Sequence, residues 1–229
     1  MAASQQRPSA RAPDADCSFC PRLAIYRDSL RAAEPEWHNA PVQDFGASGA
    51  RLLVVGLAPG LRGANRTGRP FTGDFAGDLL YETLIEFGFA AGAYGASAGD
   101  GLHLPACVIT NAVRCVPPQN KPLPEEIARC RPFLAATIAA LPELRVIVAL
   151  GRVAHESVVR AFGQKPAAFP FAHGAEHVLA ARETAGQRLR AARTILLADS
   201  YHCSRLNTNT GVLTQEMFRA VFAKVRARI

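Results

Sequence analysis

The chain has 229 residues and, with 26 Lys and Arg against 19 Asp and Glu, a formal net charge of +7. Its 49% hydrophobic and 20% charged residues exclude a disordered acidic chain, and its length excludes a small domain that depends on disulfides. We find no apolar run of about 18 residues and no apolar leader, so we expect neither a membrane span nor a secretory signal. The positive charge is a weak indication of a polyanionic partner.

The first residues differ in composition from the rest of the chain. Residues 1–15 are rich in Ala, Gln, Pro and Arg and are expected to form a disordered tail. A single domain is expected over residues 16–229. Without a secretory signal the cytoplasm is the default compartment, and disulfides are uncommon there.

Four of the six cysteines stand in a pattern that suits metal binding. Cys17 and Cys20 form a C-x2-C pair after the tail, and Cys115 and Cys130 are separated by 14 residues that include four prolines. Four thiolates in this arrangement fit a four-iron cluster or a zinc ion, with unrelated buried thiols as the alternative. Cys107 lies in an apolar run and is expected to be a core residue.

Four short apolar runs predict buried strands, because their apolar residues are consecutive rather than alternating. They span residues 51–56, 106–110, 145–150 and 194–198. Helical spacing of apolar residues predicts helices at 77–87, 125–141, 153–162 and 214–229, the last capped by Thr214. The basic stretch 182–193 is expected to face solvent. Strands that alternate with helices predict an α/β fold, a three-layer α/β/α sandwich with a central four-stranded, mainly parallel sheet.

The loop after the first strand is a candidate binding loop, because ligands of such folds bind beyond the carboxyl ends of the strands. It runs from Gly56 to Asp74 and matches neither a P-loop nor a G-x-G-x-x-G motif. Its glycines would let backbone amides approach a phosphate or a base. Phe71 could stack on a planar ligand or cap the core edge, and Asp74 could be an N-terminal helix cap.

The loops after the other strands carry further candidates. Asn111 follows the second strand and suits the reading of a base edge, with an Asx turn as the alternative. His155 follows the third strand and is expected to be a helix surface or core residue. His173 precedes Gly174 in a loop that is expected to be flexible. His202 follows the fourth strand among small polar residues, a position that favours a functional role.

These segments together resemble the uracil-DNA glycosylase superfamily, and most closely its iron–sulfur family 5 (type b) of bacterial and archaeal enzymes. The resemblance is carried by residues 56–60, 63–74, 110–115 and 200–211 and by the four-cysteine pattern. It implies a monofunctional DNA N-glycosylase of base excision repair. Such an enzyme flips uracil, and other deaminated bases such as hypoxanthine, out of DNA and hydrolyses the N-glycosidic bond to leave an abasic site.

The resemblance also implies roles for individual residues. Phe71 would stack on the flipped base, Asn111 would read its Watson–Crick edge, and His202 would donate to the pyrimidine O2. Asp74 would position water at the sugar C1′. The substrate-binding set that follows from the resemblance comprises Gly56, Ala58, Phe71, Asn111, His173, Gly174, Arg205 and Leu206.

For the cysteines, the resemblance implies that Cys17, Cys20, Cys115 and Cys130 hold a structural [4Fe–4S] cluster, with zinc as the alternative. The implied partner is DNA that contains uracil or other deaminated bases. A monomer without membrane contact, cytoplasmic and associated with the nucleoid, is expected.

Two departures from the superfamily pattern bear on the chemistry. The stretch 56–59 offers no side chain that could act as a base, a gap that family 5 shares, and this makes Asp74 the candidate. The last motif reads His202-Cys203-Ser204 where relatives commonly have His-Pro-Ser, so Cys203 could lie near the pocket. A metal-stabilised DNA-binding module and an iron–sulfur electron carrier are the alternative functions.

Overall fold

The computed structural model describes residues 12–180 and 194–229. Residues 1–11 of the expected tail and the basic stretch 182–193 lie outside the described residues. The α-helices are Pro21–Ala33 (α1), Ala64–Thr67 (α2), Phe75–Glu86 (α3), Pro124–Ala139 (α4), Arg152–Ala161 (α5), Arg205–Asn209 (α6) and Gln215–Arg226 (α7), and short 3-10 helices span Pro118–Asn120 and Pro166–Ala168. The strands are Phe45–Gly46 (β1), Leu52–Gly56 (β2), Cys107–Asn111 (β3), Val146–Leu150 (β4), Glu176–Ala180 (β5) and Thr194–Ser200 (β6).

The predicted α/β class is confirmed, and the sheet has six strands rather than four. Their order is β1-β3-β2-β4-β6-β5, with β3, β2, β4 and β6 parallel and an antiparallel strand at each edge. The prediction missed both edge strands for physical reasons. β1 has only two residues, and β5 is covered on one face, so it carries no continuous apolar run.

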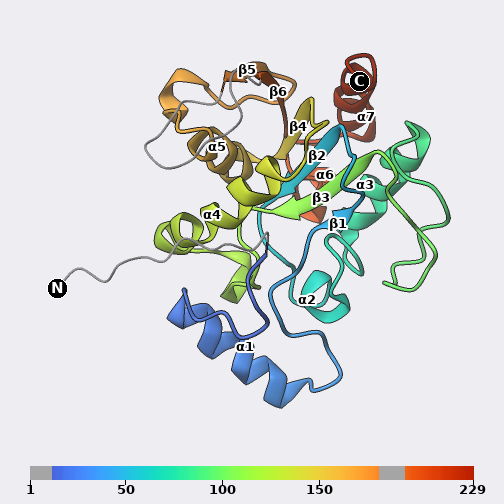
Figure 1. Cartoon of the computed structure of the whole chain (residues 1–229). Helices are drawn as coiled ribbons and strands as arrows, with labels where there is room; N and C mark the ends of the chain where they lie inside the picture. The colour runs from blue at the N-terminus through green and yellow to red at the C-terminus, as the bar shows by residue number, and fades with distance from the viewer. Residues whose placement is uncertain (1–11, 181–193) are drawn as a thin grey trace.

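The four central strands are mostly apolar, because helices cover both faces of the sheet (Figure 1), and their polar residues lie at or near the strand ends. From β2, Leu52 and Val54 pack in one core with side chains of α3 and α7. Leu53 and Val55 face the opposite way and pack in a second core with α4 and α5. This alternation fixes the register of the sheet, because a slip of one residue would exchange the two cores.

A third, smaller core joins the N-terminal segment to the sandwich. Leu23 of α1 packs there with Val113, Cys130 and Phe133, which come from the segment after β3 and from α4. The sequence analysis did not predict α1. Pro21 at its first position is a start signal, but only two of its apolar side chains are buried, too few for a clear helical pattern.

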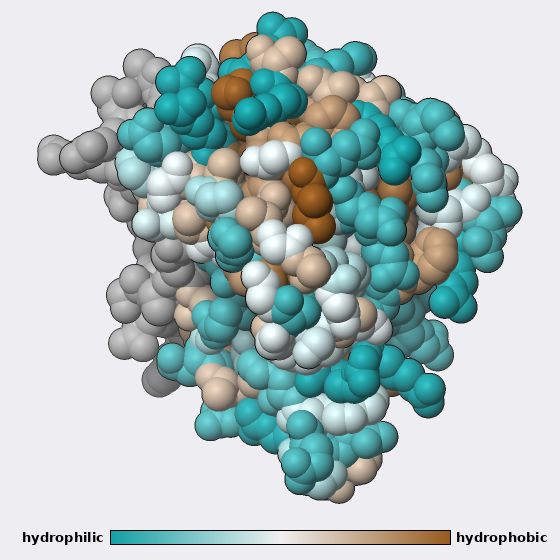
Figure 2. All heavy atoms as spheres, turned by 90° about the vertical axis from the view of Figure 1, so that its right-hand side faces the viewer, coloured by the Kyte–Doolittle hydropathy of each residue, from teal (hydrophilic) through white to brown (hydrophobic). Residues whose placement is uncertain are grey.

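The C-terminal helix begins as its sequence predicts. The hydroxyl of Thr214 accepts a hydrogen bond from the amide of Met217 at 3.2 Å and so caps α7. Within residues 12–180 and 194–229, no helix is long and apolar enough to cross a membrane. The face that includes α3 and α7 is mostly hydrophilic, with apolar side chains at scattered points (Figure 2).

Candidate active site

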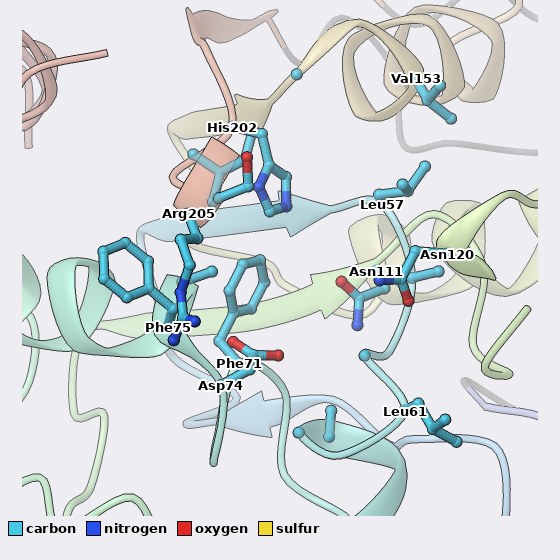
Figure 3. Close-up of a pocket in the computed structure, with 18 of the residues that line it drawn as sticks. Leu57, Leu61, Phe71, Asp74, Phe75, Asn111, Asn120, Val153, His202 and Arg205 are labelled. Atoms are coloured by element: carbon cyan, nitrogen blue, oxygen red, sulfur yellow. The ribbon is translucent and has the colours of Figure 1, made fainter. Parts of the chain in front are cut away.

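A pocket of about 710 Å³ opens beyond the carboxyl ends of the parallel strands (Figure 3). Parallel strands end at the same edge of the sheet, so loops that are distant in sequence meet there. Six residues predicted from the sequence line this pocket, namely Ala58, Phe71, Asp74, Asn111, His202 and Arg205.

The end of β2 lets two of these side chains approach each other. A Cβ atom on Gly56 would overlap with Oδ1 of Asn111 and would lie 2.5 Å from Cζ of Phe71. The bare backbone of Gly56 therefore forms the surface against which the Phe71 ring and the Asn111 amide pack.

Phe71 holds an unusual backbone conformation. Its φ is +53°, in the left-handed region that a bulky side chain adopts only at a cost of order 1–3 kcal/mol. Its carbonyl packs against Gly77 of α3, where a Cβ atom would clash with it. Phe71 is 6% exposed, so the alternative prediction that it caps the core edge also describes its surroundings.

Three buried polar atoms of the pocket have no hydrogen-bond partner. They are Oδ1 of Asp74, Oδ1 of Asn111 and Nδ1 of His202, and they come from three separate segments of the chain. Buried polar groups are almost always hydrogen-bonded in folded proteins. Three unpartnered atoms that line one pocket therefore indicate that a polar ligand completes them.

Asp74 stands at the N-cap position of α3, but its side chain makes no capping hydrogen bond. The carboxylate instead lies beside the bare backbones of Gly60 and Gly63, where added Cβ atoms would approach Oδ2 within 3 Å. Burial raises the pKa of Asp74, opposed by the backbone amides of Gly77 and Ala76. Asp74 therefore occupies the helix-cap position that the alternative prediction gives it, and its carboxylate also lines the pocket.

His202 presents its ring to the pocket from the loop after β6 (Figure 3). The ring is stacked 5.9 Å from the Phe71 ring, with an interplanar angle of 25°. The backbone carbonyl of His202 accepts a hydrogen bond from Nδ2 of Asn207 at 2.8 Å, which fixes the loop. Burial lowers the pKa of His202 to about 4, so the imidazole is neutral near pH 7.

Cys203 faces away from the pocket and into the core. It is fully buried, and its thiol donates to the carbonyl of Ala76 at 3.4 Å. Burial raises its pKa, and the nearby Asp74 carboxylate raises it further. The thiol therefore packs the loop of His202 against the start of α3.

Arg205 and Leu206 begin α6 at the mouth of the pocket. The guanidinium of Arg205 lies 5.2 Å from the ring centroid of Phe75, and both residues line the pocket. Leu206 does not line it, and its side chain is 72% exposed. A large apolar side chain in this position is free to contact a partner outside the pocket.

The predicted pair His173 and Gly174 does not line the pocket. Nδ1 of His173 accepts from the amide of Tyr201 at 3.1 Å, and the amide of Gly174 donates to the carbonyl of Asp199 at 2.8 Å. Both bonds hold the segment beside β6, directly before His202. The assignment of His173 and Gly174 to substrate binding stays a prediction.

His155 is a buried core residue with a charged partner. Its Nδ1 lies 2.7 Å from Oδ1 of Asp199 and its Nε2 lies 2.7 Å from the carbonyl of Phe169. Burial is the largest single effect and lowers the pKa of His155, but the hydrogen bond and charge of Asp199 together with the carbonyl of Phe169 outweigh it, so the pKa is raised. His155, His177 and Asp199 form the only group, among the residues that the structure describes, whose three possible metal-ligand atoms lie within 4.8 Å of one another. We interpret the contact between His155 and Asp199 as an ion pair between α5 and β6, because a proton already joins the two side chains.

The four predicted cysteine ligands converge on one small cavity. Cys17, Cys20, Cys115 and Cys130 all line it, between α1, the segment after β3 and α4. Burial, with a smaller contribution from the neighbouring thiols, raises the pKa of Cys20 and of Cys115 to about 12. Cations at the cavity would favour the thiolate forms.

The four thiols are soft donors that suit two kinds of metal group. Four thiolates can hold a tetrahedral zinc ion or a [4Fe–4S] cluster. The convergence of all four cysteines on one cavity fits either group.

The sequence analysis missed several residues that line the pocket. Asn120 is one of them, and it adopts a φ of +56° directly after a proline-rich segment. Asn120 lies neither in a segment with periodic apolar residues nor at the end of a predicted strand, so no sequence pattern indicated it. The others include apolar and basic side chains, Leu57, Leu61, Arg62, Leu150, Arg152 and Val153.

The lowered pKa of His202 predicts a contribution to stability that depends on pH. Between about pH 6.5 and pH 4 the unfolded chain binds a proton at His202 and the folded chain does not, so stability falls as the pH falls through this window. The loss is at most about 3.5 kcal/mol, because one pKa unit corresponds to about 1.4 kcal/mol, and solvent contact of the ring reduces it.

Denaturant unfolding at several pH values measures this contribution. His202→Asn should lose less stability than the parent chain between pH 6.5 and pH 4. Parallel curves for the two proteins would contradict a buried, neutral His202.

Comparisons with known proteins agree with this geometry. Residues 43–226 match the model of the uracil DNA glycosylase superfamily. The chain is 45% identical to the type-5 uracil-DNA glycosylase of Thermus thermophilus over 216 residues, 92% of each chain. It is 39% identical to the type-5 enzyme of Pyrobaculum aerophilum, over 93% of this chain and 88% of the relative. A type-4 enzyme of Archaeoglobus fulgidus is 36% identical over 60% of this chain and 63% of its own. On these matches and on the pocket at the ends of its strands, the chain belongs to the uracil-DNA glycosylase superfamily.

Proposed function

We propose that the pocket takes a uracil base flipped out of DNA, and that the chain hydrolyses the N-glycosidic bond of that nucleotide. The chain is a DNA glycosylase that acts in DNA repair, as its family and its type-5 relatives indicate. The single observation that carries the proposal is the set of unpartnered polar atoms on Asp74, Asn111 and His202. A flat, polar base matches such a set together with the Phe71 ring.

Base recognition falls to Phe71 and Asn111. The Phe71 ring offers a stacking surface, and the amide of Asn111 carries both a donor and an acceptor for the Watson–Crick edge. The Asn111 side chain points toward the space beside the Phe71 ring (Figure 3). Stacking and edge contacts thus come from different strand ends and fix the base in two directions.

His202 acts on the leaving base. When the bond between C1′ and N1 breaks, its electron pair goes to the base, which becomes an anion with charge on O2. The neutral imidazole of His202 donates a hydrogen bond to this oxygen and stabilises the charge as it forms. Its desolvated setting strengthens that interaction relative to water.

Asp74 acts on the water. The sugar that remains is an oxocarbenium-like cation, and the oxygen of one water adds to C1′ while its proton passes to Asp74 or to solvent. The base is then protonated and leaves with an abasic site behind it. Because the cation is very electrophilic, the water needs placement more than a strong base, which makes His202 the more important residue.

The mouth of the pocket supplies contacts to the DNA. Arg62, Arg152 and Arg205 line the pocket and can neutralise phosphates on either side of the flipped nucleotide. The exposed Leu206 can enter the base stack and fill the vacated space.

A [4Fe–4S] cluster held by the four cysteines completes the proposal. It would join α1, the segment after Asn111 and α4, and so stabilise the region beside the pocket. The convergence of all four thiols on one cavity supports such a cluster, with zinc as the alternative.

We further propose that residues 16–229 act as a monomeric domain on nucleoid DNA, and that other deaminated bases such as hypoxanthine are also removed. A pocket of about 710 Å³ has room for a purine as well as a pyrimidine. A DNA-binding module or an electron carrier would need no convergent set of unpartnered polar atoms, so neither alternative is favoured.

The first prediction concerns the two catalytic candidates. His202→Ala should lower the single-turnover excision of uracil by about 10²–10³-fold, as expected for the loss of a donor to a developing anion. Asp74→Asn should lose much less, because it keeps a polar group beside the water. His103→Ala, an exposed histidine outside the pocket, is the control. A His202→Ala enzyme as fast as the parent would refute the mechanism.

The second prediction tests the close approach at Gly56. Gly56→Ala should displace the Phe71 ring and the Asn111 amide and reduce excision by about 10²-fold or more. The matched control is Gly49→Ala, because nothing lies within 4 Å of a Cβ atom there. Equal rates for the two variants, with both proteins folded, would rule out the proposed packing.

The third prediction concerns the cluster. The purified protein should be brown and contain about four iron and four sulfide per chain, and Cys115→Ser should lose the colour and lower the melting temperature. Cys107→Ala, a change at a buried cysteine outside the cavity, should keep the iron. One zinc per chain and no iron would overturn the cluster.

A further inference from the structure

The aromatic surface of the pocket rests on a buried ion pair that does not face the pocket. Phe71 lines the pocket, but neither Arg69 nor Asp100 does. The side chains of Arg69 and Asp100 are only 5% and 6% exposed. Charges withdrawn from water to this degree require a full set of partners.

Arg69 has such a set. Its two terminal nitrogens donate to the two oxygens of Asp100 at 2.7 and 2.6 Å, and its Nε donates to Oγ1 of Thr72 at 2.7 Å. This bidentate geometry is specific to a guanidinium and a carboxylate. The guanidinium also lies 5.2–5.9 Å from three ring centroids, those of Phe45, Tyr81 and Tyr94.

Asp100 ties this arrangement to a second loop. Its oxygens accept from the amides of Gly95 at 2.9 Å and of Leu102 at 3.0 Å. The Arg69 guanidinium beside it holds the pKa of the Asp100 carboxyl well below its usual range. The pair therefore stays charged at neutral pH and fastens residues 95–102 to the binding loop.

The two tyrosines that stack on Arg69 also hold the backbone on each side of Phe71. The hydroxyl of Tyr81 donates to the carbonyl of Pro70 at 2.5 Å. The hydroxyl of Tyr94 donates to the carbonyl of Phe71 at 3.3 Å and accepts from the amide of Gly73 at 3.4 Å. Residues 70–73 are thus bound at three successive points around the strained Phe71, which needs surroundings that impose its φ of +53°.

We propose that Arg69 and Asp100 are positioning residues of the excision reaction, whose ion pair holds Phe71 in the conformation that presents its ring to the base. They act through Phe71 and touch neither the base nor the sugar. The inference rests on the proposed function, because that function makes the flipped base the ligand of Phe71.

The test separates positioning from a general role in stability. Arg69→Lys keeps the charge but cannot form the bidentate pair, and Asp100→Asn keeps the shape but removes the charge. Both should lower single-turnover uracil excision by about 10–100-fold, while the Kd for uracil-containing DNA changes by less than about twofold. Arg219→Lys, in an ion pair between α7 and Glu86 of α3, should leave both values unchanged.

The decisive readout is the double variant Arg69→Lys with Phe71→Ala. If Arg69 acts through Phe71, the double variant should be no slower than Phe71→Ala alone. The inference is overturned if the losses of the two single variants add in full in the double variant. It is also overturned if Arg69→Lys folds and excises uracil at the parent rate. If Arg69→Lys does not fold, Asp100→Asn with and without Phe71→Ala gives the same comparison. A parent chain that releases no uracil would instead contradict the proposed function.

Discussion

The close approach at Gly56 is the constraint on which the rest of the pocket depends. Because no side chain stands at the end of β2, the Phe71 ring and the Asn111 amide can meet over the backbone there. The parallel register sets this meeting point, since Gly56 pairs with Asn111 on the neighbouring strand. The fold thereby brings a stacking surface and a polar reader to one place without a flexible connection between them.

The burial of polar side chains determines the chemistry of the pocket. Buried polar atoms on Asp74, Asn111 and His202 lack partners, and burial keeps His202 neutral. Neutrality matters because a hydrogen-bond donor that need not lose a proton stays in place while charge develops on the base. These unpartnered atoms destabilise the folded state, and the two apolar cores on the faces of the sheet offset that destabilisation.

Much of this arrangement could be predicted from the sequence, and the limits have physical causes. Consecutive apolar residues in 51–56 identify a strand covered on both faces, so its carboxyl end predicts the site. The edge strand β5 and the pocket residue Asn120 carry no such pattern, because β5 is covered on a single face and Asn120 ends a 3-10 helix of only three residues. The pair of Arg69 and Asp100 joins two loops 31 residues apart, and only tertiary structure shows that contact.

The central claim is that this pocket releases a base and leaves the DNA backbone intact. The most direct measurement is the product analysis of a uracil-containing DNA duplex and a matched thymine duplex, each incubated with excess protein. The account predicts one free uracil and one alkali-sensitive abasic site per uracil, no cleavage before alkali, and no product from the thymine duplex. Tight binding of the uracil duplex without release of free base would contradict it.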